Sequence, residues 1–340
     1  MVGRKERHCM TSLIISDLHL SDNPLEEYRF YVFDWLEELK EQYDIENIFL
    51  LGDITEKKDH HSAKLVNMVA EELNALASNI YRLWILRGNH DGVDPSWPFF
   101  KFLQTNNRIM YITEPTYAGS DYLFLPHSKD PANEWPDFIR EYIEDTKFIF
   151  MHQTVKGAKS SNGFLLEGLD PNIFSKFNGL CFSGDIHTPQ EVGSVIYVGS
   201  PYPVNFGDDF TGGAILLDGN KWERIEYESI KRVMLDLDYT PEVVNPLFEV
   251  DEGDQFKIRM KVNRSDSNSF NDWKKDTIEY VKLNGGIVVS IELKLAEEKL
   301  RLLAKRKFKN TDPLTVFNRF CAVENLDTYY KEVGIGFIEK

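Results

Sequence analysis

Metal-compatible side chains recur at five points in the first 190 residues, each directly after a short apolar run. In chain order these points read Ser-Asp-Leu-His, Gly-Asp, Gly-Asn-His-Asp, a single His and Gly-Asp-Ile-His. Imidazole, carboxylate and asparagine oxygen together suit Mn²⁺, Fe or Zn²⁺. The chain has 8 histidines in 340 residues, and four of them fall here. The candidate residues are Asp17, His19, Asp53, Asn89, His90, His152, Asp185 and His187.

These ligands are numerous enough for two ions that share one bridging carboxylate. Two ions held about 3.5–4 Å apart can clamp a phosphoryl group and lower the pKa of a bound water. Taken singly, the Asp-x-His and Gly-Asp motifs are common as plain turns, whereas Gly-Asn-His-Asp is more specific. All five motifs, in order and each ending an expected strand, predict a two-metal phosphoesterase.

The elements that must position these residues are short strands alternating with amphipathic helices. One helix is expected to begin at Pro24, with Asn23 as its N-cap, and another to run from about 62 to 77. Continuous apolar runs predict strands that are covered on both faces. Such alternation indicates a layered α/β domain, in which ligands collect at the carboxyl ends of the strands. The expected strands are 13–16, 48–51, 83–86, 148–151, 180–183 and 195–198.

The pattern changes near Pro241 and Pro246, where we expect a domain boundary. Beyond it, a strand at 256–262, a helix at 269–283 and a strand at 287–293 predict a small β-α-β unit. The last segment joins a basic stretch to a short helix capped at Asp312, which is too small to be stable alone and which we expect to bind a partner. The predicted parts are a main domain at 1–240, the β-α-β unit at 247–295 and a helical tail at 296–340.

Composition narrows the class of protein. The net charge of -16 argues against bulk electrostatic coating of nucleic acid, but permits an enzyme that grips a phosphodiester locally. The sequence contains no run of 18 or more apolar residues, so we expect no membrane-spanning helix. The basic N-terminus is not followed by the apolar stretch typical of a signal peptide. Three scattered cysteines do not make a disulfide framework, so we expect a cytoplasmic protein.

The ordered motifs resemble those of the calcineurin-like metallophosphoesterase superfamily, whose pattern is D-x-H, G-D, G-N-H-(D/E), H and G-H-x-H. The resemblance implies a layered αββα sandwich. It also implies that Asp53 bridges two metals and that His90, which is no ligand, faces the scissile phosphate and stabilises or protonates the leaving oxygen. One metal would be held by Asp17, His19 and His187, and the other by Asn89, His152 and Asp185.

Asp185 departs from this pattern, because the superfamily usually has His there. Aspartate adds a negative charge and a harder ligand, which favours Mn²⁺ or Mg²⁺ over Zn²⁺ at that position. We therefore expect two divalent ions, with Mn²⁺ foremost and Mg²⁺ or Fe as alternatives.

Further stretches are similar to SbcD-type DNA repair nucleases and their bacteriophage relatives. They are 152–158, 182–190 and 197–201 followed by Phe206-Gly207, and the similarity covers about 13–218. It implies a DNA nuclease that forms a homodimer, with the β-α-β unit as a reduced DNA-engaging cap. It also implies an SMC-like ATPase partner (SbcC-type) that docks on the C-terminal region.

Three other classes stay open. A serine/threonine phosphatase fits less well, because no arginine follows Gly52-Asp53. A small-molecule phosphodiesterase would use the same metals, and a non-catalytic scaffold would not need to retain every ligand. Outside the motifs, His60 and His61 are candidate substrate contacts, whereas His127 is assigned to structure or solvent. The aromatic run at 97–100 is expected to be core rather than a wall for DNA.

Overall fold

The computed structural model describes residues 11–119, 121–238, 248–263 and 270–295, together with Leu314, Phe317, Asn318, Phe320 and Cys321. The chain divides into two compact units. One comprises 1–235, 245–258 and 275–291, and the other comprises 236–244, 259–274 and 292–340. The three-part division expected from the sequence stays a prediction.

The first unit contains two six-stranded sheets. In the first, parallel strands β1 to β4 are joined at the β1 edge by antiparallel β11, which pairs in turn with β12. Its strands are β1 (Thr11–Ile15), β2 (Asn47–Leu50), β3 (Arg82–Leu86), β4 (Ile109–Ile112), β11 (Gly213–Asp218) and β12 (Lys221–Glu226).

The second sheet has the order β5-β6-β7-β8-β10-β9, with parallel pairing from β6 through β10. Its strands are β5 (Thr116–Ala118), β6 (Tyr122–Leu125), β7 (Phe148–His152), β8 (Leu180–Gly184), β9 (Gln190–Val192) and β10 (Val195–Tyr197).

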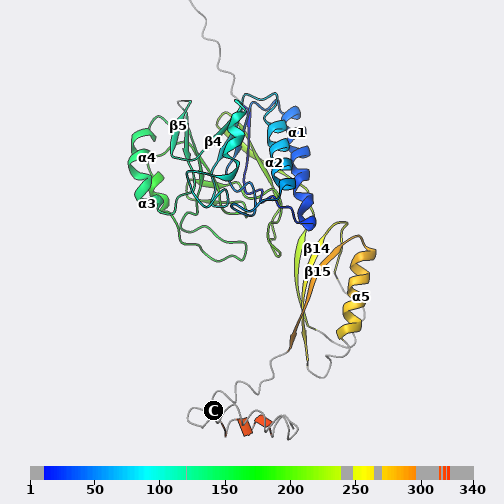
Figure 1. Cartoon of the computed structure of the whole chain (residues 1–340). Helices are drawn as coiled ribbons and strands as arrows, with labels where there is room; N and C mark the ends of the chain where they lie inside the picture. The colour runs from blue at the N-terminus through cyan, green and yellow to red at the C-terminus, as the bar shows by residue number, and fades with distance from the viewer. Residues whose placement is uncertain are drawn as a thin grey trace, which may run out of the picture. The chain divides into compact units, whose positions relative to one another are not determined.

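The two sheets face each other, and helices cover their outer faces (Figure 1). Helices α1 (Tyr31–Gln42) and α2 (Ala63–Leu76) pack on the first sheet, and α3 (Pro131–Glu134) and α4 (Pro136–Tyr142) lie on the side of the second. Between the sheets, the rings of Phe49 and Phe150 stack with centroids 4.0 Å apart. The αββα sandwich expected from the resemblance is confirmed.

Continuous apolar strands suit this architecture because each one lies between two cores. In β1, Leu13 and Ile15 join the core beneath α1 and α2, whereas Ile14 joins the core between the sheets. Alternate side chains of a strand point to opposite faces, so both faces must be apolar. Each of the six strands expected from the sequence is present, with its bounds shifted by no more than two residues.

The helices begin where their capping residues predict. The side chain of Asn23 accepts a hydrogen bond from the Leu25 amide, and Ser62 Oγ accepts one from the Leu65 amide, each at 3.1 Å. The first helix differs in one respect from the expectation. Residues Pro24–Phe30 form a 3₁₀ segment (η1), and the α-helical part begins only at Tyr31.

The remaining sheet has the order β13-β14-β15. The order β14 (Gln255–Val262), α5 (Phe270–Leu283) and β15 (Ile287–Leu295) confirms the expected β-α-β sequence, and β13 (Arg232–Asp238) adds a strand. The predicted helical tail lies outside the described residues, apart from five residues that are helical. Within the described part of the chain, no helix has the length and apolar character needed to span a membrane.

Candidate metal centre

Five strand ends, three from one sheet and two from the other, deliver the candidate residues to one place. The residues after β1, β2 and β3 lie against those at the ends of β7 and β8. Parallel strands bring their carboxyl ends to the same edge of a sheet, and the two sheets of the sandwich present these edges together. All eight residues proposed from the sequence are therefore neighbours, through contacts that join positions up to 168 residues apart.

The backbone of these strand ends is unusual. Six non-glycine residues in the described part have positive φ, and four of them are candidate ligands: Asp17 (56°), His19 (43°), Asp53 (55°) and Asp185 (80°). L-residues reach this region at a cost of roughly 1–3 kcal/mol, and such residues cluster at functional sites. Each turn thus directs its side chain into the site at the expense of local strain.

Glycines directly precede three of the candidate ligands because no other residue would fit. A Cβ on Gly88 would lie 2.2 Å from Asp53 Oδ1, and a Cβ on Gly52 or Gly184 would lie 2.6 or 2.7 Å from His152 Nδ1. All of these distances are shorter than any real Cβ contact. The close approach of the loops around Asp53 and His152 therefore depends on these glycines.

A first ligand group consists of Asp17, His19 and His187, whose ligand atoms lie within 4.8 Å of one another. The Nε2 atoms of His19 and His187 are 3.1 Å apart. Asp17 is completely buried, and its Oδ2 has no hydrogen-bond partner. Buried groups of this kind normally find partners, so these atoms fit a cation.

A second group surrounds His152 Nε2. Asn89 Oδ1 lies 2.9 Å from this nitrogen and 3.0 and 3.2 Å from the two oxygens of Asp53, so it faces acceptors unless the amide is turned over. Asp185 Oδ1 is 3.8 Å from the same nitrogen. Asp17, Asp53 and His152 also offer ligand atoms within 4.8 Å of one another. A divalent ion among these oxygens and nitrogens would satisfy all of them.

Asp53 lies between the two groups, with one oxygen directed to each. Its Oδ2 is 3.6 Å from His19 Nε2, and its Oδ1 is 3.5 Å from His152 Nε2. This is the arrangement expected of a bridging carboxylate. The residues present therefore fit two ions, with Asp53 shared between them.

The electrostatics of the site follow from its burial. Burial raises the pKa of Asp17 above its usual value. For Asp53 burial acts in the same direction, but the imidazoles of His152 and His19 outweigh it and hold the pKa well below its usual range. Burial would lower the pKa of His152, yet Asp53 and Asp17 raise it well above the usual value. Without a metal ion, the carboxylates therefore favour the positively charged form of the His152 imidazole, which compensates part of their charge.

Hydrogen bonds outside the site orient the imidazoles. His152 Nδ1 donates to the carbonyl of Leu51, so Nε2 is the nitrogen that faces the site and can bind a metal. Glu56 Oε2 lies 3.2 Å from His19 Nδ1 and leaves Nε2 of that ring facing the site. The imidazole of His19 in turn lowers the pKa of Glu56 to about 2. Carboxylate–histidine pairs of this type fix the ring and strengthen it as a ligand.

His90 is half-buried beside these groups. Its amide donates to Asp53 Oδ1 at 2.8 Å, and its Nδ1 donates to the carbonyl of Glu56 at 2.6 Å. Its second ring nitrogen is therefore the one available to substrate. Distances alone would also allow His90 to hold an ion with His19 and Asp53, so its role outside the ligand set stays a prediction.

The sequence did not single out three residues that hold the loops of the site. The carboxylate of Asp91 accepts from the amides of Gly88, Asp53 and Ile54 at 2.6, 3.0 and 2.9 Å. Arg29 is buried and donates to the carbonyl of His19, and Thr154 Oγ1 donates to Asp185 Oδ2. Asp91 ends the Gly-Asn-His-Asp motif, which was the available signal.

His127, assigned to structure or solvent from the sequence, lies next to the site. Its ring centroid is 6.1 Å from that of His152, and burial lowers its pKa to about 4. The two other histidines proposed as substrate contacts differ from each other. His61 Nε2 is 2.9 Å from Thr55 Oγ1 and its ring stacks on Phe99 at 4.2 Å, whereas His60 is exposed.

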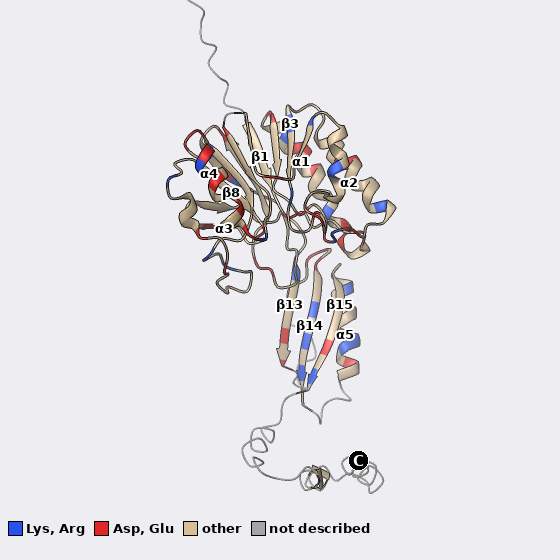
Figure 2. Cartoon of the chain, turned by 60° about the vertical axis from the view of Figure 1, so that its left-hand side comes forward, with Lys and Arg blue, Asp and Glu red and all other residues tan. Residues whose placement is uncertain are grey.

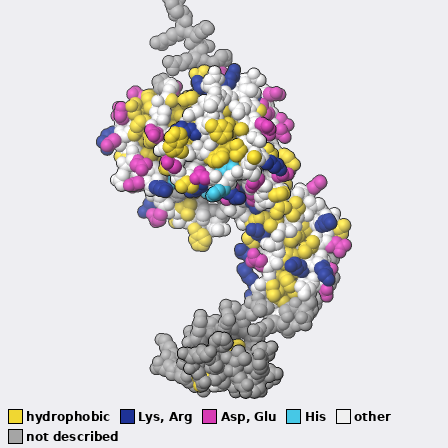
Figure 3. Space-filling model, viewed as in Figure 1, with side chains coloured by type: hydrophobic (Ala, Val, Ile, Leu, Met, Phe, Trp, Pro, Cys, Tyr) yellow, Lys and Arg dark blue, Asp and Glu magenta, His cyan; other side chains and the backbone are white. Residues whose placement is uncertain are grey.

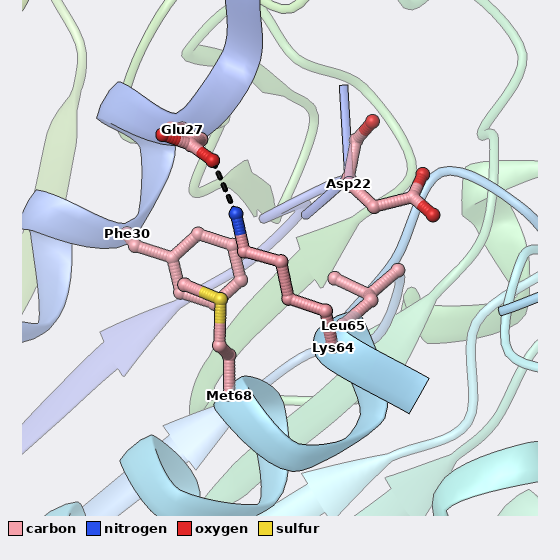
Figure 4. Close-up of a pocket in the computed structure, with 7 residues that line it drawn as sticks. Asp22, Glu27, Phe30, Lys64, Leu65 and Met68 are labelled. Atoms are coloured by element: carbon pink, nitrogen blue, oxygen red, sulfur yellow. Dashed lines mark hydrogen bonds and ion pairs between the residues drawn. The ribbon is translucent and has the colours of Figure 1, made fainter. Parts of the chain in front are cut away.

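The surface of the first unit shows histidine side chains and, separately, a small hollow. Figure 3 shows histidine side chains reaching the surface of the first unit. A separate small hollow is lined by residues of η1 and α2, among them Phe30 and Met68, and contains an ion pair between Glu27 and Lys64 (Figure 4). No histidine lines it, and its lysine is already paired with a carboxylate, so its chemistry differs from that of the strand-end site.

Comparison with known proteins identifies the class. The family model of the calcineurin-like phosphoesterases matches residues 10–189, more than half of the chain. The chain therefore belongs to this family of metal-dependent phosphoester hydrolases. A search of curated proteins gave no match.

Matching solved structures include proteins from Danio rerio, Escherichia coli and Pseudomonas putida. A dimetal phosphatase from Danio rerio is 13% identical, covers 65% of this chain and 99% of its own, and has a TM-score of 0.40. The Escherichia coli phosphoesterase YfcE is 17% identical over 62% and 88%, with a TM-score of 0.29. The Pseudomonas putida nuclease MPE is 12% identical over 63% and 87%, with a TM-score of 0.31.

Proposed function

We propose that this chain is a two-metal phosphodiesterase that cleaves DNA. The observation that carries the phosphodiesterase chemistry is the position of Asp53, with one oxygen directed to each ligand group and one also accepting the amide of His90. The same carboxylate thus ties both predicted ion sites to the imidazole that is expected to meet the substrate.

The residues have separate tasks in this proposal. Bound ions would supply positive charge for the phosphoryl oxygens and a water of lowered pKa. His90, held through Nδ1 by the Glu56 carbonyl, presents its other nitrogen to the oxygen that leaves as the P–O bond breaks and donates a proton to it. His19 is kept in place by Glu56 and by Arg29. Mn²⁺ is the proposed metal, because Asp185 adds a hard oxygen ligand.

DNA is proposed as substrate from the stretches that resemble SbcD-type nucleases, and they border the site. Residues 152–158 begin at His152, and 182–190 include Asp185 and His187. In the third stretch, the amide of Ser200 donates to the carbonyl of His187 at 2.9 Å. A Cβ on Gly199 would lie 2.7 Å from that same carbonyl. The Gly-Ser-Pro turn therefore positions His187.

The test is to incubate purified protein with Mn²⁺ and four substrates: linear duplex DNA, single-stranded DNA, a small phosphodiester and a phosphoserine peptide. We expect Mn²⁺-dependent cleavage of DNA, its loss on chelation and little release of phosphate from the peptide. Efficient dephosphorylation of the peptide without DNA cleavage would assign the chain to the phosphatase branch. Hydrolysis of the small phosphodiester alone would assign it to small-molecule substrates.

We further propose a cytoplasmic homodimer whose segment 296–340 binds an SMC-like ATPase. A truncation ending near Ala296 tests the docking role. The shortened protein should stay folded and keep metal-dependent activity on single-stranded DNA, while losing co-purification with the ATPase. A sharp drop in melting temperature would instead show that the segment belongs to the folded core.

A further inference from the structure

Trp97 is an exposed aromatic residue on the loop that follows the Gly-Asn-His-Asp motif. Its side chain is 73% exposed, whereas the other five tryptophans, all within the described ranges, are buried or partly buried. Of the aromatic run that begins with it, Phe100 is completely buried and Phe99 stacks on His61. The expectation that the run is core thus holds for Phe100 but not for Trp97.

The loop keeps Trp97 close to His90. The amide of Phe99 donates to the carbonyl of Asp91 at 2.8 Å, which closes the loop one residue after His90. A Cβ on Gly92, two residues beyond His90, would lie 3.3 Å from the carbonyl oxygen of Trp97. These contacts hold the backbone of Trp97 against that of Gly92, two residues beyond His90, and the ring of Trp97 is exposed from this loop.

The loop is ordered by its own hydrogen bonds. The amides of Trp97 and Ser96 donate to the carbonyl and the carboxylate of Asp94, at 3.1 and 2.9 Å. The amide of Val93 donates to Asp59 Oδ1 at 3.3 Å. An aromatic ring on a pre-ordered loop loses little conformational entropy when a ligand binds.

A lysine lies over the ring. Lys101 Nζ is 5.2 Å from the Trp97 ring centroid and donates to the carbonyl of Ser96 at 3.1 Å. The neighbouring carboxylates of Asp59 and Asp94 already accept loop amides. An exposed ring beside a cation is the combination with which proteins bind single-stranded nucleic acid, because bases stack on the ring and the cation meets the phosphate.

We propose that Trp97 is a stacking platform for an unpaired base of single-stranded DNA next to the scissile phosphate, and that Lys101 contacts the adjoining backbone. This inference rests on the proposed nuclease function and names the form of DNA that the site takes. With a net charge of -16, the chain gains little from bulk attraction to phosphate. Stacking, which does not depend on net charge, can supply the missing affinity.

The experiment compares two single-stranded ligands, a thymidine 20-mer and an abasic 20-mer with the same number of phosphates. Binding is followed by fluorescence anisotropy of strands that carry a dye at one end, in the presence of Mn²⁺ and in the His90→Gln background so that the DNA is not cut. We expect the thymidine strand to bind about 5- to 150-fold more tightly than the abasic strand, since stacking contributes roughly 1–3 kcal/mol per base. Trp97→Leu should remove this preference, and Trp97→Phe should retain part of it.

Tyr81→Leu is the matched control. Tyr81 is 63% exposed and also lies beside a cation, with Arg82 5.5 Å from its ring centroid, but it precedes β3 whereas His90 follows that strand. Its substitution should leave the preference unchanged. Equal binding of both strands by the parent protein, or an unchanged preference in Trp97→Leu, would overturn the inference.

Cleavage assays separate this inference from the proposed function. With His90 intact, Trp97→Leu should raise KM for single-stranded DNA by a similar factor and change kcat little. If the wild-type protein cuts no DNA but still prefers the thymidine strand through Trp97, the nuclease proposal fails while the platform stands. If it cuts DNA and Trp97→Leu cuts with the same KM, the platform fails alone.

Discussion

The strand-end site and the three-stranded sheet are both rich in charged residues, but they arrange them in opposite ways. On the sheet, positive and negative side chains alternate between neighbouring strands (Figure 2). Arg259 of β14 lies 4.0 Å from Asp236 of β13 and 3.8 Å from Glu292 of β15, and Lys261 lies 3.7 Å from Asp238. These exposed or half-exposed charges neutralise one another.

In the strand-end site, by contrast, hydrogen-bond acceptors lie next to other acceptors. The ligand atoms of Asp17, Asp53 and His152 converge, and the two imidazole nitrogens of the other group face each other. Asp17, Asp53, His152 and His19 are buried and His187 is partly buried, so water compensates little of the charge. A charged cluster thus indicates a metal site when it is buried and short of hydrogen-bond donors, and not because it is charged.

The ion pairs of the sheet also affect the expected DNA-engaging cap. The sequence of β14 presents Lys257, Arg259 and Lys261 as a basic stripe. Two of these three cations have carboxylates opposite them on neighbouring strands. The stripe therefore offers DNA less positive charge than its sequence alone indicates, and DNA binding by this sheet stays a prediction.

The largest effect is expected from Asp53→Asn. This change removes the charge that both ligand groups share, so both ions and all metal-dependent hydrolysis should be lost. Wild-type protein should gain about 2.7 kcal/mol of stability at a Mn²⁺ concentration 100-fold above Kd. The variant should gain almost none. Metal content and melting temperature with and without Mn²⁺ measure this, and retention of two ions would contradict the bridging role.

His90→Gln should lower the hydrolysis rate by about 10²- to 10⁴-fold, the range typical of general acid–base catalysis. Both ions should remain, because His90 is predicted to meet substrate rather than metal. Rate measurements must be paired with metal analysis of the same sample. Loss of an ion together with activity would place His90 among the ligands, as its distance to His19 and Asp53 allows.

Asp185→Ala should reduce the metal count from two to about one. Asp185 Oδ1 lies 3.8 Å from His152 Nε2 of the second ligand group, and Asp185 Oδ2 accepts a hydrogen bond from Thr154 Oγ1. Asp185→His, which restores the pattern of the superfamily, should keep both ions and shift the preference toward softer metals. An unchanged metal count in Asp185→Ala would show that this residue is no ligand.

The smallest effect is expected on the sheet. Arg259→Gln breaks two partly exposed ion pairs, which should change the free energy of unfolding by less than about 1 kcal/mol. Chemical denaturation measures this change, with Lys261→Gln as a parallel case. A loss of several kcal/mol would show that the charges of the sheet contribute as strongly as those of the site, and the contrast between the two regions would fail.

The sequence by itself determined the candidate site residues and the strands that carry them. An apolar run that ends at Gly-Asp or at His predicts a buried strand and a polar turn from local pattern alone. The parallel sheet then brings those turns to one edge. The capping residues Asn23 and Ser62 likewise act on amides within three residues of themselves.

Only the tertiary structure decided which atoms meet. The orientation of Asp53 toward both groups, the pairing of Glu56 with His19 and the place of His127 beside His152 depend on contacts between distant segments. Short strands such as β5 and β9 exist because a neighbouring strand completes their hydrogen bonds.

The aromatic run at 97–100 likewise shows what the sequence alone does not determine. Its sequence is uniformly apolar, yet packing buries Phe100 and leaves Trp97 exposed, because burial depends on which neighbours the fold supplies.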